Sequence, residues 1–180
     1  LQASLMNEPR PQTVKEKEKF SSHGRTGFLI LRGKWGLAVD KLLLWISGYS
    51  LITAQYAWAA GDTYQQTLML YTTGAKSGKK RIASLPYFDV DGKFVVRGSN
   101  GGGPPAPHWV HNIRANGAIK VRAARKTSTM RAHVATGDER AELYQKLCRM
   151  SRSTAYYQKM CAPRELPLVV LVQKPGTDPN

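Results

Sequence analysis

Three consecutive strand-like segments with very short connections constrain the fold of this chain more than any other feature. Thr67–Thr73 and Arg81–Val90 are rich in β-branched, aromatic and other apolar residues, and a short glycine-containing turn separates them. Asp91-Gly92 then joins the second segment to Lys93–Arg97, and an Asp-Gly pair between apolar segments is a typical two-residue hairpin connection. Because connections this short can join only antiparallel neighbours, these segments predict an antiparallel sheet rather than a doubly wound one.

The C-terminal half of the chain extends the same pattern. Further strands are predicted at Ile119–Ala123, Thr127–Ala135 and Leu168–Val172. Helices are predicted at His108–Ala115 and from Thr136 to about Met150, where Asp and Glu occupy the first turn as the helix dipole favours. We therefore expect a mainly β (α+β) fold, an antiparallel barrel of about six strands with peripheral helices.

Composition divides the chain into four segments. They are a polar N-terminal arm (1–34), an amphipathic helical segment (35–61), the barrel domain (62–174) and a short tail (175–180). Residues 42–61 carry no formal charge, and the apolar positions recur at helical spacing with a break near Gly48. This segment is predicted to cover the core, and the alternatives are a helix on a membrane surface or a membrane span.

The strong positive charge of the chain restricts its partners. The 27 Lys and Arg residues against 12 Asp and Glu give a net charge of +15, which favours nucleic acid, an anionic membrane surface or a small polyanionic ligand. The cations are not interleaved with aromatic residues in one stripe, so we expect no nucleic-acid partner. Two cysteines make no disulfide framework and no secretory signal is readable, so a cytoplasmic location is expected.

The turn at residues 72–81 is the candidate anion-binding element. It holds Gly74 and Gly78, three hydroxyl side chains and four cations within ten residues. Exposed backbone N–H groups, hydroxyls and concentrated positive charge are what a phosphate needs. The glycines are one residue too close for a Walker A loop, and an ordinary solvated basic turn is the alternative.

Sequence motifs for catalysis by the protein alone are absent. The chain has no Gly-x-Ser-x-Gly, His-Glu-x-x-His or Cys-x-x-Cys motif. His108 and His111 lie three residues apart but lack a nearby Cys, Asp or Glu, so no metal site is predicted. A basic turn and a Gly-rich loop without acid–base residues indicate that a cofactor brings the chemistry. Tyr87, Trp109 and Tyr156-Tyr157 would line its pocket, unless they belong to the core.

Several segments, in order, resemble the deazaflavin-dependent nitroreductase family of actinobacteria. Leu70–Arg81 contains the basic turn, and Ser99–Gly102 followed by His108–Asn116 forms the second part of the resemblance. Ala135–Ala141 and Pro167–Leu171 complete it near the C-terminus. Each motif is short, but their order and spacing match those of the family.

The resemblance covers about residues 64–172 and implies a split β-barrel, as in FMN-binding oxidoreductases, that binds the deazaflavin coenzyme F-420. It places Lys76, Ser77 and Arg81 on the phosphate and acidic tail of the coenzyme, and the following strand beside the deazaflavin ring. The implied coenzyme-binding residues are Ala75, Lys76, Ser77, Gly78, Arg81, Ile82, Ala83, Ser84, Leu85, Pro86, Gly98, Ser99, Asn100, His108, Trp109 and Asn112.

The resemblance also implies a reaction, the transfer of a hydride from the reduced deazaflavin to a small apolar acceptor. A quinone, an enone or a nitroaromatic would fit this description. Of the family's tyrosines above the acceptor only Tyr157 is matched here, and Thr154 stands where another would be. These two residues, or solvent, are the expected proton donors. Because the tyrosines differ from those of the family, the resemblance implies coenzyme binding but does not imply nitroimidazole reduction.

Other hypotheses stay open at this point. A relative with the same barrel would bind FMN or haem instead of the deazaflavin. A non-enzymatic protein would use the positive charge to bind an anionic membrane or nucleic acid. Peripheral contact with the inner face of the cell membrane, through residues 1–61, is compatible with catalysis if the acceptor is lipid-soluble.

Overall fold

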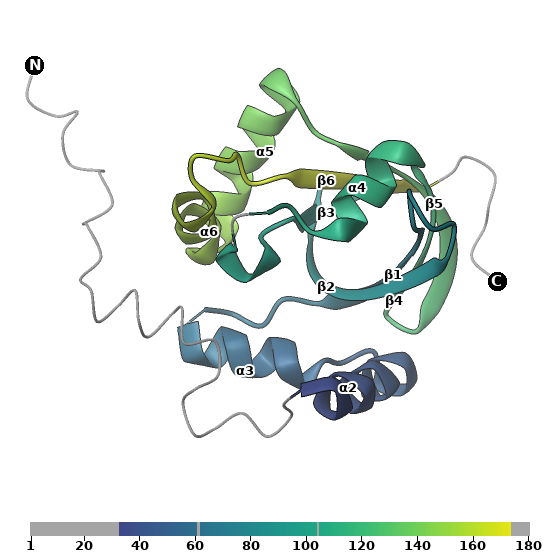
Figure 1. Ribbon diagram of the computed structural model, residues 1–180. Coiled ribbons are helices and arrows are strands. Elements are labelled where there is room, and N and C mark those ends of the chain that lie inside the picture. Colours follow the sequence, from purple (N-terminus) through teal and green to yellow (C-terminus); the bar gives the residue numbers. More distant parts are fainter. Residues whose placement is uncertain (1–32, 61, 104, 174–180) are drawn as a thin grey trace, which may run out of the picture.

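The computed structural model describes residues 33–60, 62–103 and 105–173 (Figure 1). The predicted tail at 175–180 lies outside these residues, as does the predicted arm except for its last two residues, which begin the first helix.

Six antiparallel strands close into a barrel, as the sequence predicts. Around the barrel the order is β1-β2-β3-β6-β5-β4, so every strand has two neighbours and no edge is exposed. The bounds match the predicted strands within a residue or two. They are β1 (Thr67–Thr73), β2 (Lys80–Val90), β3 (Lys93–Arg97), β4 (Ala118–Ala123), β5 (Lys126–Val134) and β6 (Leu168–Gln173).

Helices surround the barrel. In chain order they are α2 (Gly33–Ser47), α3 (Leu51–Ala60), the single turn η1 (Asn100–Gly102), α4 (His108–Ala115), α5 (Gly137–Met150) and α6 (Ser153–Cys161). The sequence placed Cys161 in a helical region but gave bounds only for α4 and α5, because Ser, Thr and two Tyr residues give the α6 segment low helix propensity. Tertiary contacts stabilise it instead, since Thr154, Tyr156 and Cys161 are buried.

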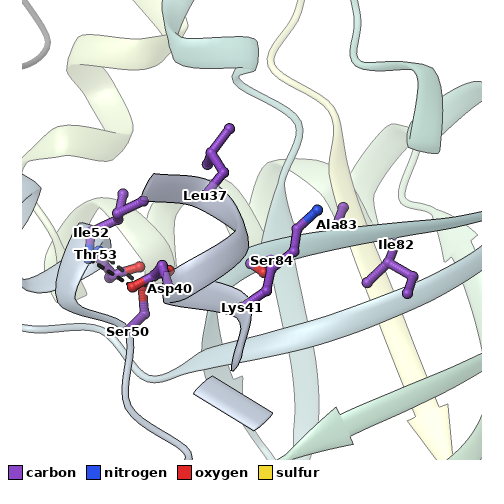
Figure 2. Close-up of a pocket in the computed structure, with 9 residues that line it drawn as sticks. All are labelled: Leu37, Asp40, Lys41, Ser50, Ile52, Thr53, Ile82, Ala83 and Ser84. Carbon is purple, nitrogen blue, oxygen red and sulfur yellow. Dashed lines mark hydrogen bonds between the residues drawn. The ribbon is translucent and has the colours of Figure 1, made fainter. Parts of the chain in front are cut away.

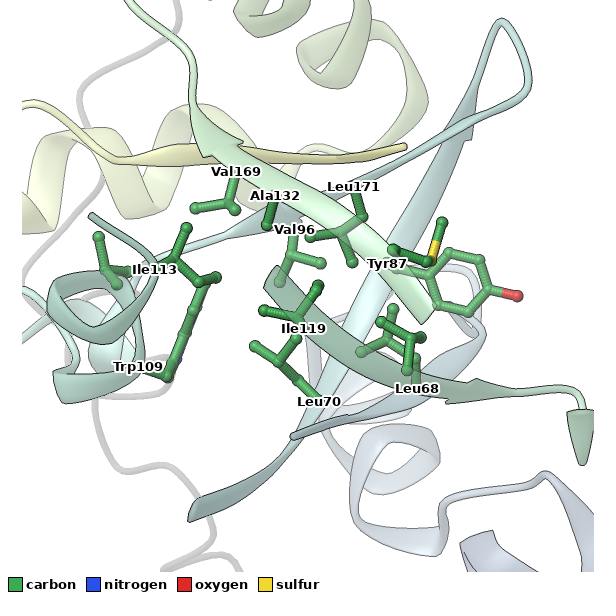
Figure 3. Packing of buried hydrophobic residues seen from close by; sticks show 13 residues of the cluster. Leu68, Leu70, Tyr87, Val96, Trp109, Ile113, Ile119, Ala132, Val169 and Leu171 are labelled. Atoms are coloured by element: carbon green, nitrogen blue, oxygen red, sulfur yellow. The ribbon is translucent and has the colours of Figure 1, made fainter. Parts of the chain in front are cut away.

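The strands separate two hydrophobic clusters, one inside the barrel and one outside it. Figure 3 shows the inner cluster, in which Val96, Leu171 and Tyr87 meet inside the barrel. Phe88, next to Tyr87 in β2, points the opposite way and packs with Leu147 of α5 in the outer cluster. Alternation along a strand therefore lets β2 contribute to both cores.

The α2–α3 pair forms a layer on one side of the barrel (Figure 1). The helices meet at an angle of 105° at Gly48, which has a positive φ of 77° and confirms the predicted break. Asp40, buried in α2, accepts hydrogen bonds from Ser50 Oγ (2.8 Å) and from the N–H of Ile52 (3.1 Å), and so fixes the start of α3. Within the described ranges no single helix has the length and apolarity to cross a membrane, and only this bent pair meets those criteria together.

Removal of the Asp40 carboxylate should loosen the α2–α3 pair. Asp40→Ala leaves one buried and one partly buried donor without this acceptor, and we expect a loss of about 1–3 kcal/mol in the free energy of unfolding. Asp40→Asn keeps one acceptor oxygen and should lose less. Chemical denaturation of the three proteins measures the difference, and equal stability of Asp40→Ala and the parent would contradict this role of Asp40.

Candidate functional site

A cavity of about 270 Å³ lies between the α2–α3 pair and the first residues of β2 (Figure 2). The sequence analysis placed Ile82, Ala83 and Ser84 beside a coenzyme ring, and these residues form the β2 side of the cavity. It missed the helical side, which is lined by Leu37, Asp40, Lys41, Ser50, Ile52 and Thr53. The available signal was Asp40 and Lys41, a charged pair between the apolar residues of α2.

The Ser84 hydroxyl is the clearest sign that the cavity takes a polar ligand group. This oxygen is buried and makes no hydrogen bond with any described residue. A buried hydroxyl without a partner is unfavourable by roughly 1–3 kcal/mol, so such groups are rare unless a ligand or water satisfies them. Lys41 of α2 lines the same cavity and brings a positive charge to it (Figure 2).

The predicted anion-binding turn connects β1 directly to the β2 side of the cavity. Gly74 N–H donates to the Lys79 carbonyl (2.9 Å) and Gly78 N–H donates to the Gly74 carbonyl (2.8 Å), so the turn is closed on itself. Gly78 adopts a positive φ of 64°, which a residue with a side chain rarely adopts. The four cations, Lys76, Lys79, Lys80 and Arg81, are all exposed to solvent.

Asn112 of α4 holds this turn in place. Its side-chain oxygen accepts from the N–H of Ala75 (3.0 Å), and its amide nitrogen donates to Thr72 Oγ1 (3.0 Å). Asn112 is buried, and both ends of its amide are used in these contacts. The structure thus brings two segments of the resemblance together and gives Asn112 a positioning role.

The Gly-rich loop after β3 is held by residues that the sequence analysis did not select. Arg164 donates to the carbonyls of Gly98 (3.4 Å) and Gly103 (2.9 Å), and the Cys161 thiol donates to the carbonyl of Ser99 (3.6 Å). Pro167 and Val110 pack closely on Gly98, where an added Cβ would come within 3.1 Å of both. The loop is therefore fixed from the outside, between α4 and the C-terminal segment.

The remaining predicted ligand contacts differ in accessibility. Trp109 is only 9% exposed and belongs to the inner cluster, where Figure 3 shows it beside Ile113, so it offers a ligand no more than an edge. Leu85 also packs against that cluster, whereas His108 is exposed. Among the described residues no group of three His, Cys, Asp or Glu side chains is arranged to hold a metal ion.

A partly buried arginine, Arg97, organises the region that contains both predicted proton donors. Its Nη1 donates to Ser153 Oγ (2.9 Å) and Thr154 Oγ1 (2.8 Å), and its guanidinium lies 5.4 Å from the centre of the Tyr157 ring. Thr154 is fully buried and bonds both Arg97 and the Leu147 carbonyl, an arrangement that disfavours it as a proton donor to a ligand. The role of Tyr157 stays a prediction.

Burial raises the pKa of the Tyr157 phenol above its usual value, and the nearby Arg97 cation partly offsets that rise. Tyr157 therefore carries its proton at neutral pH. Sequence reasoning missed Arg97 because an arginine at the end of a strand is usually exposed to solvent.

The protein is thus a closed antiparallel barrel in which β2 follows a basic turn and then lines a cavity. Residues 52–173, about two thirds of the chain, match the model of the F420H(2)-dependent quinone reductase family. The chain belongs to this family. The predicted relationship to F-420-dependent reductases is thereby confirmed, and FMN as an alternative cofactor gains no support.

Individual relatives agree with the family match. An F420H(2)-dependent quinone reductase of Mycobacterium tuberculosis is 37% identical over 60 residues, which are 33% of this chain and 40% of that protein. The matched part of the chain thus spans well under half the length of this curated relative. A solved structure described as an F420-H2 dependent reductase is 31% identical, with a TM-score of 0.52 over 58% of this chain and 92% of the other.

Hydrogen exchange of one backbone amide, that of Ala75, measures the positioning role of Asn112. In Asn112→Ala the Ala75 N–H loses its acceptor, and we expect its hydrogen exchange to accelerate about tenfold, the equivalent of 1.4 kcal/mol. The Gly78 N–H, whose acceptor lies within the turn, serves as the internal reference. Unchanged protection at Ala75 would show that the turn does not depend on Asn112.

The effect of Arg97 on Tyr157 can be measured by titration. Because the cation favours the phenolate, Arg97→Met should raise the pKa of Tyr157 further. Tyrosine absorbance is followed against pH, and subtraction of the titration of Tyr157→Phe isolates this one residue. A lower pKa in Arg97→Met would overturn the proposed sign of the interaction.

Proposed function

We propose that this protein binds reduced coenzyme F-420 and catalyses transfer of its hydride to a quinone. The observation that carries the proposal is the continuity of β2, which begins at the anion-binding turn and continues along the cavity. Lys80 of the turn and Ser84 lie on the same face of β2, four residues or about 13 Å apart in an extended strand. One ligand with an anionic tail and a ring can therefore occupy both places.

The residues present fit this coenzyme, whose ring carries a phosphate and glutamate tail. Lys76, Ser77 and Arg81 would hold the anionic tail through charge-assisted hydrogen bonds. Ser84 would donate its unpaired hydroxyl to a polar atom of the ring. A volume of about 270 Å³ is close to the lower end of the range for ligand pockets. This volume suits a ring system whose tail lies outside the cavity.

In its reduced form the bound coenzyme supplies the hydride. Reduction of a quinone to a hydroquinone consumes one hydride and one proton, so negative charge develops on an acceptor oxygen before it is protonated. The ammonium of Lys41 lies on the cavity wall, where a fixed positive charge would stabilise that oxygen. Protonated Tyr157 or solvent would then provide the proton.

The tail contacts give the sharpest test of this function. Oxidised coenzyme titrated at low salt should bind, and the affinity should fall as salt is added because the tail contacts are ionic. Lys76→Ala and Arg81→Ala should each weaken binding by about tenfold or more, and the double variant should be weaker than either.

Lys159→Ala is the matched control, since it removes the same charge from the exposed side of α6 and should leave affinity unchanged. Oxidation of the reduced coenzyme with a panel of quinones, enones and nitroaromatics identifies the acceptor, and quinones are expected to react fastest. Absence of coenzyme binding at low salt would refute the proposal.

A further inference from the structure

One edge of the Arg97 guanidinium makes no hydrogen bond with the residues that the structure describes. Nη1, which is outside this edge, donates to the hydroxyls of Ser151 (3.4 Å), Ser153 (2.9 Å) and Thr154 (2.8 Å). Nε and Nη2 form the open edge, and among the described residues no carboxylate forms a salt bridge with Arg97. With such an edge, which we call the Nε–Nη2 edge, arginine binds a carboxylate through two parallel hydrogen bonds.

The surroundings of Arg97 compensate its charge only in part. The guanidinium lies 4.7 Å from the centre of the Phe88 ring and 5.4 Å from that of the Tyr157 ring, and such contacts favour a cation without neutralising it. The Asp62 carboxylate is one hydroxyl further away, because it accepts a hydrogen bond from Ser151 Oγ (2.6 Å). Burial lowers the pKa of Arg97 below its usual value, and the nearby Tyr157 and Asp62 offset this only partly. Arg97 therefore stays charged at neutral pH, with less counter-charge than would balance its lost hydration.

Lost hydration makes Arg97 a stronger binder of anions than an exposed cation. An exposed side chain such as Lys79 must release bound water before it pairs with an anion, which offsets most of the attraction. Arg97 has already lost part of its water on folding, so the pairing costs less there. A planar carboxylate matches the Nε–Nη2 edge, because each of its oxygens accepts one of the two hydrogen bonds. The edge is therefore a candidate carboxylate site.

We propose that the Nε–Nη2 edge of Arg97 binds a carboxylate of the hydride acceptor, so that acceptors with a carboxylate side chain are preferred over neutral ones. The carboxylate takes no part in the reaction, because the hydride and the proton both go to the quinone ring. Arg97 acts on binding, and it would hold such an acceptor beside Tyr157, the candidate proton donor. The carboxylate site needs no coenzyme, whereas its use by an acceptor rests on the proposed function.

Titration with a simple aromatic carboxylate tests the site without the coenzyme. With the full chain, 2-naphthoate should shift the NMR signal of the Arg97 Nε–H group, which is assigned by its loss in Arg97→Lys. Methyl 2-naphthoate has the same ring but no charge, and should leave this signal unchanged. The Nε–H signal of Arg81 reports any competing binding of the carboxylate at the basic turn.

A matched pair of acceptors tests the preference. A naphthoquinone with a propanoate side chain and its methyl ester have nearly the same ring chemistry, because two methylene groups separate the charge from the ring. With reduced F-420, the ratio of kcat/KM for acid over ester should fall about tenfold in Arg97→Met, mainly through KM. The ratio cancels any effect on Tyr157, which both acceptors share. Arg152→Met removes the same charge from an exposed residue at the start of α6 and should keep the parent ratio.

Three results would overturn the proposal. They are no shift of the Arg97 signal with 2-naphthoate, a shift at Arg81 alone, or the same acid-to-ester ratio in the parent and in Arg97→Met. If Arg97→Met does not fold, Arg97→Lys takes its place, because it keeps a cation but lacks the two-donor edge and should lose most of the preference. Absence of coenzyme binding together with a shift of the Arg97 signal would support the carboxylate site and overturn its use by a hydride acceptor. Failure of the site and failure of the proposed function are therefore distinguishable.

Discussion

The two hydrogen bonds of the Asn112 amide are the interaction on which the arrangement of the site depends. The barrel closes through backbone pairing, but that pairing alone does not determine where the cations of the β1–β2 turn lie. Asn112 fixes the turn against α4, and α4 is fixed in turn because Trp109 and Ile113 enter the inner cluster. The position of the positive charge is thus coupled to the barrel core. A neutral amide suits this task because it donates and accepts hydrogen bonds without changing the charge next to the basic turn.

Strand β2 shows how one segment can serve both packing and binding. Leu85 points to the inner cluster and Phe88 to the outer one, while Ser84 turns toward the α2–α3 pair. The pair itself depends on the buried Asp40 carboxylate, which joins its two helices. Each wall of the cavity therefore belongs to an element whose other contacts are already fixed, so binding there would require little rearrangement of the backbone.

Local signals explain which parts of this structure could be predicted from the sequence. Asp91-Gly92 and the apolar segments around it determine which strands are neighbours, because the residues in contact are only a few positions apart in the sequence. The break of the helical segment at Gly48 is likewise a local effect. The cavity depends on contacts between Ser84 and residues more than thirty positions earlier, and no short pattern encodes such contacts. Arg97 and Arg164 illustrate the same limit, because a single arginine does not reveal which distant hydroxyl or carbonyl it will meet. The family resemblance identified the turn and the Gly-rich loop, since both are short motifs, but not the residues that hold them.

The hydrogen bonds from Arg164 order the Gly-rich loop before any ligand binds. Glycine-rich segments lose more conformational freedom than others when they become ordered, and here the Gly98 and Gly103 carbonyls are already tethered by one guanidinium. The entropy of that loop is therefore lost when the chain folds, not when a ligand arrives. A ligand that contacted this loop would therefore meet a preformed surface, and its binding would not wait for loop closure.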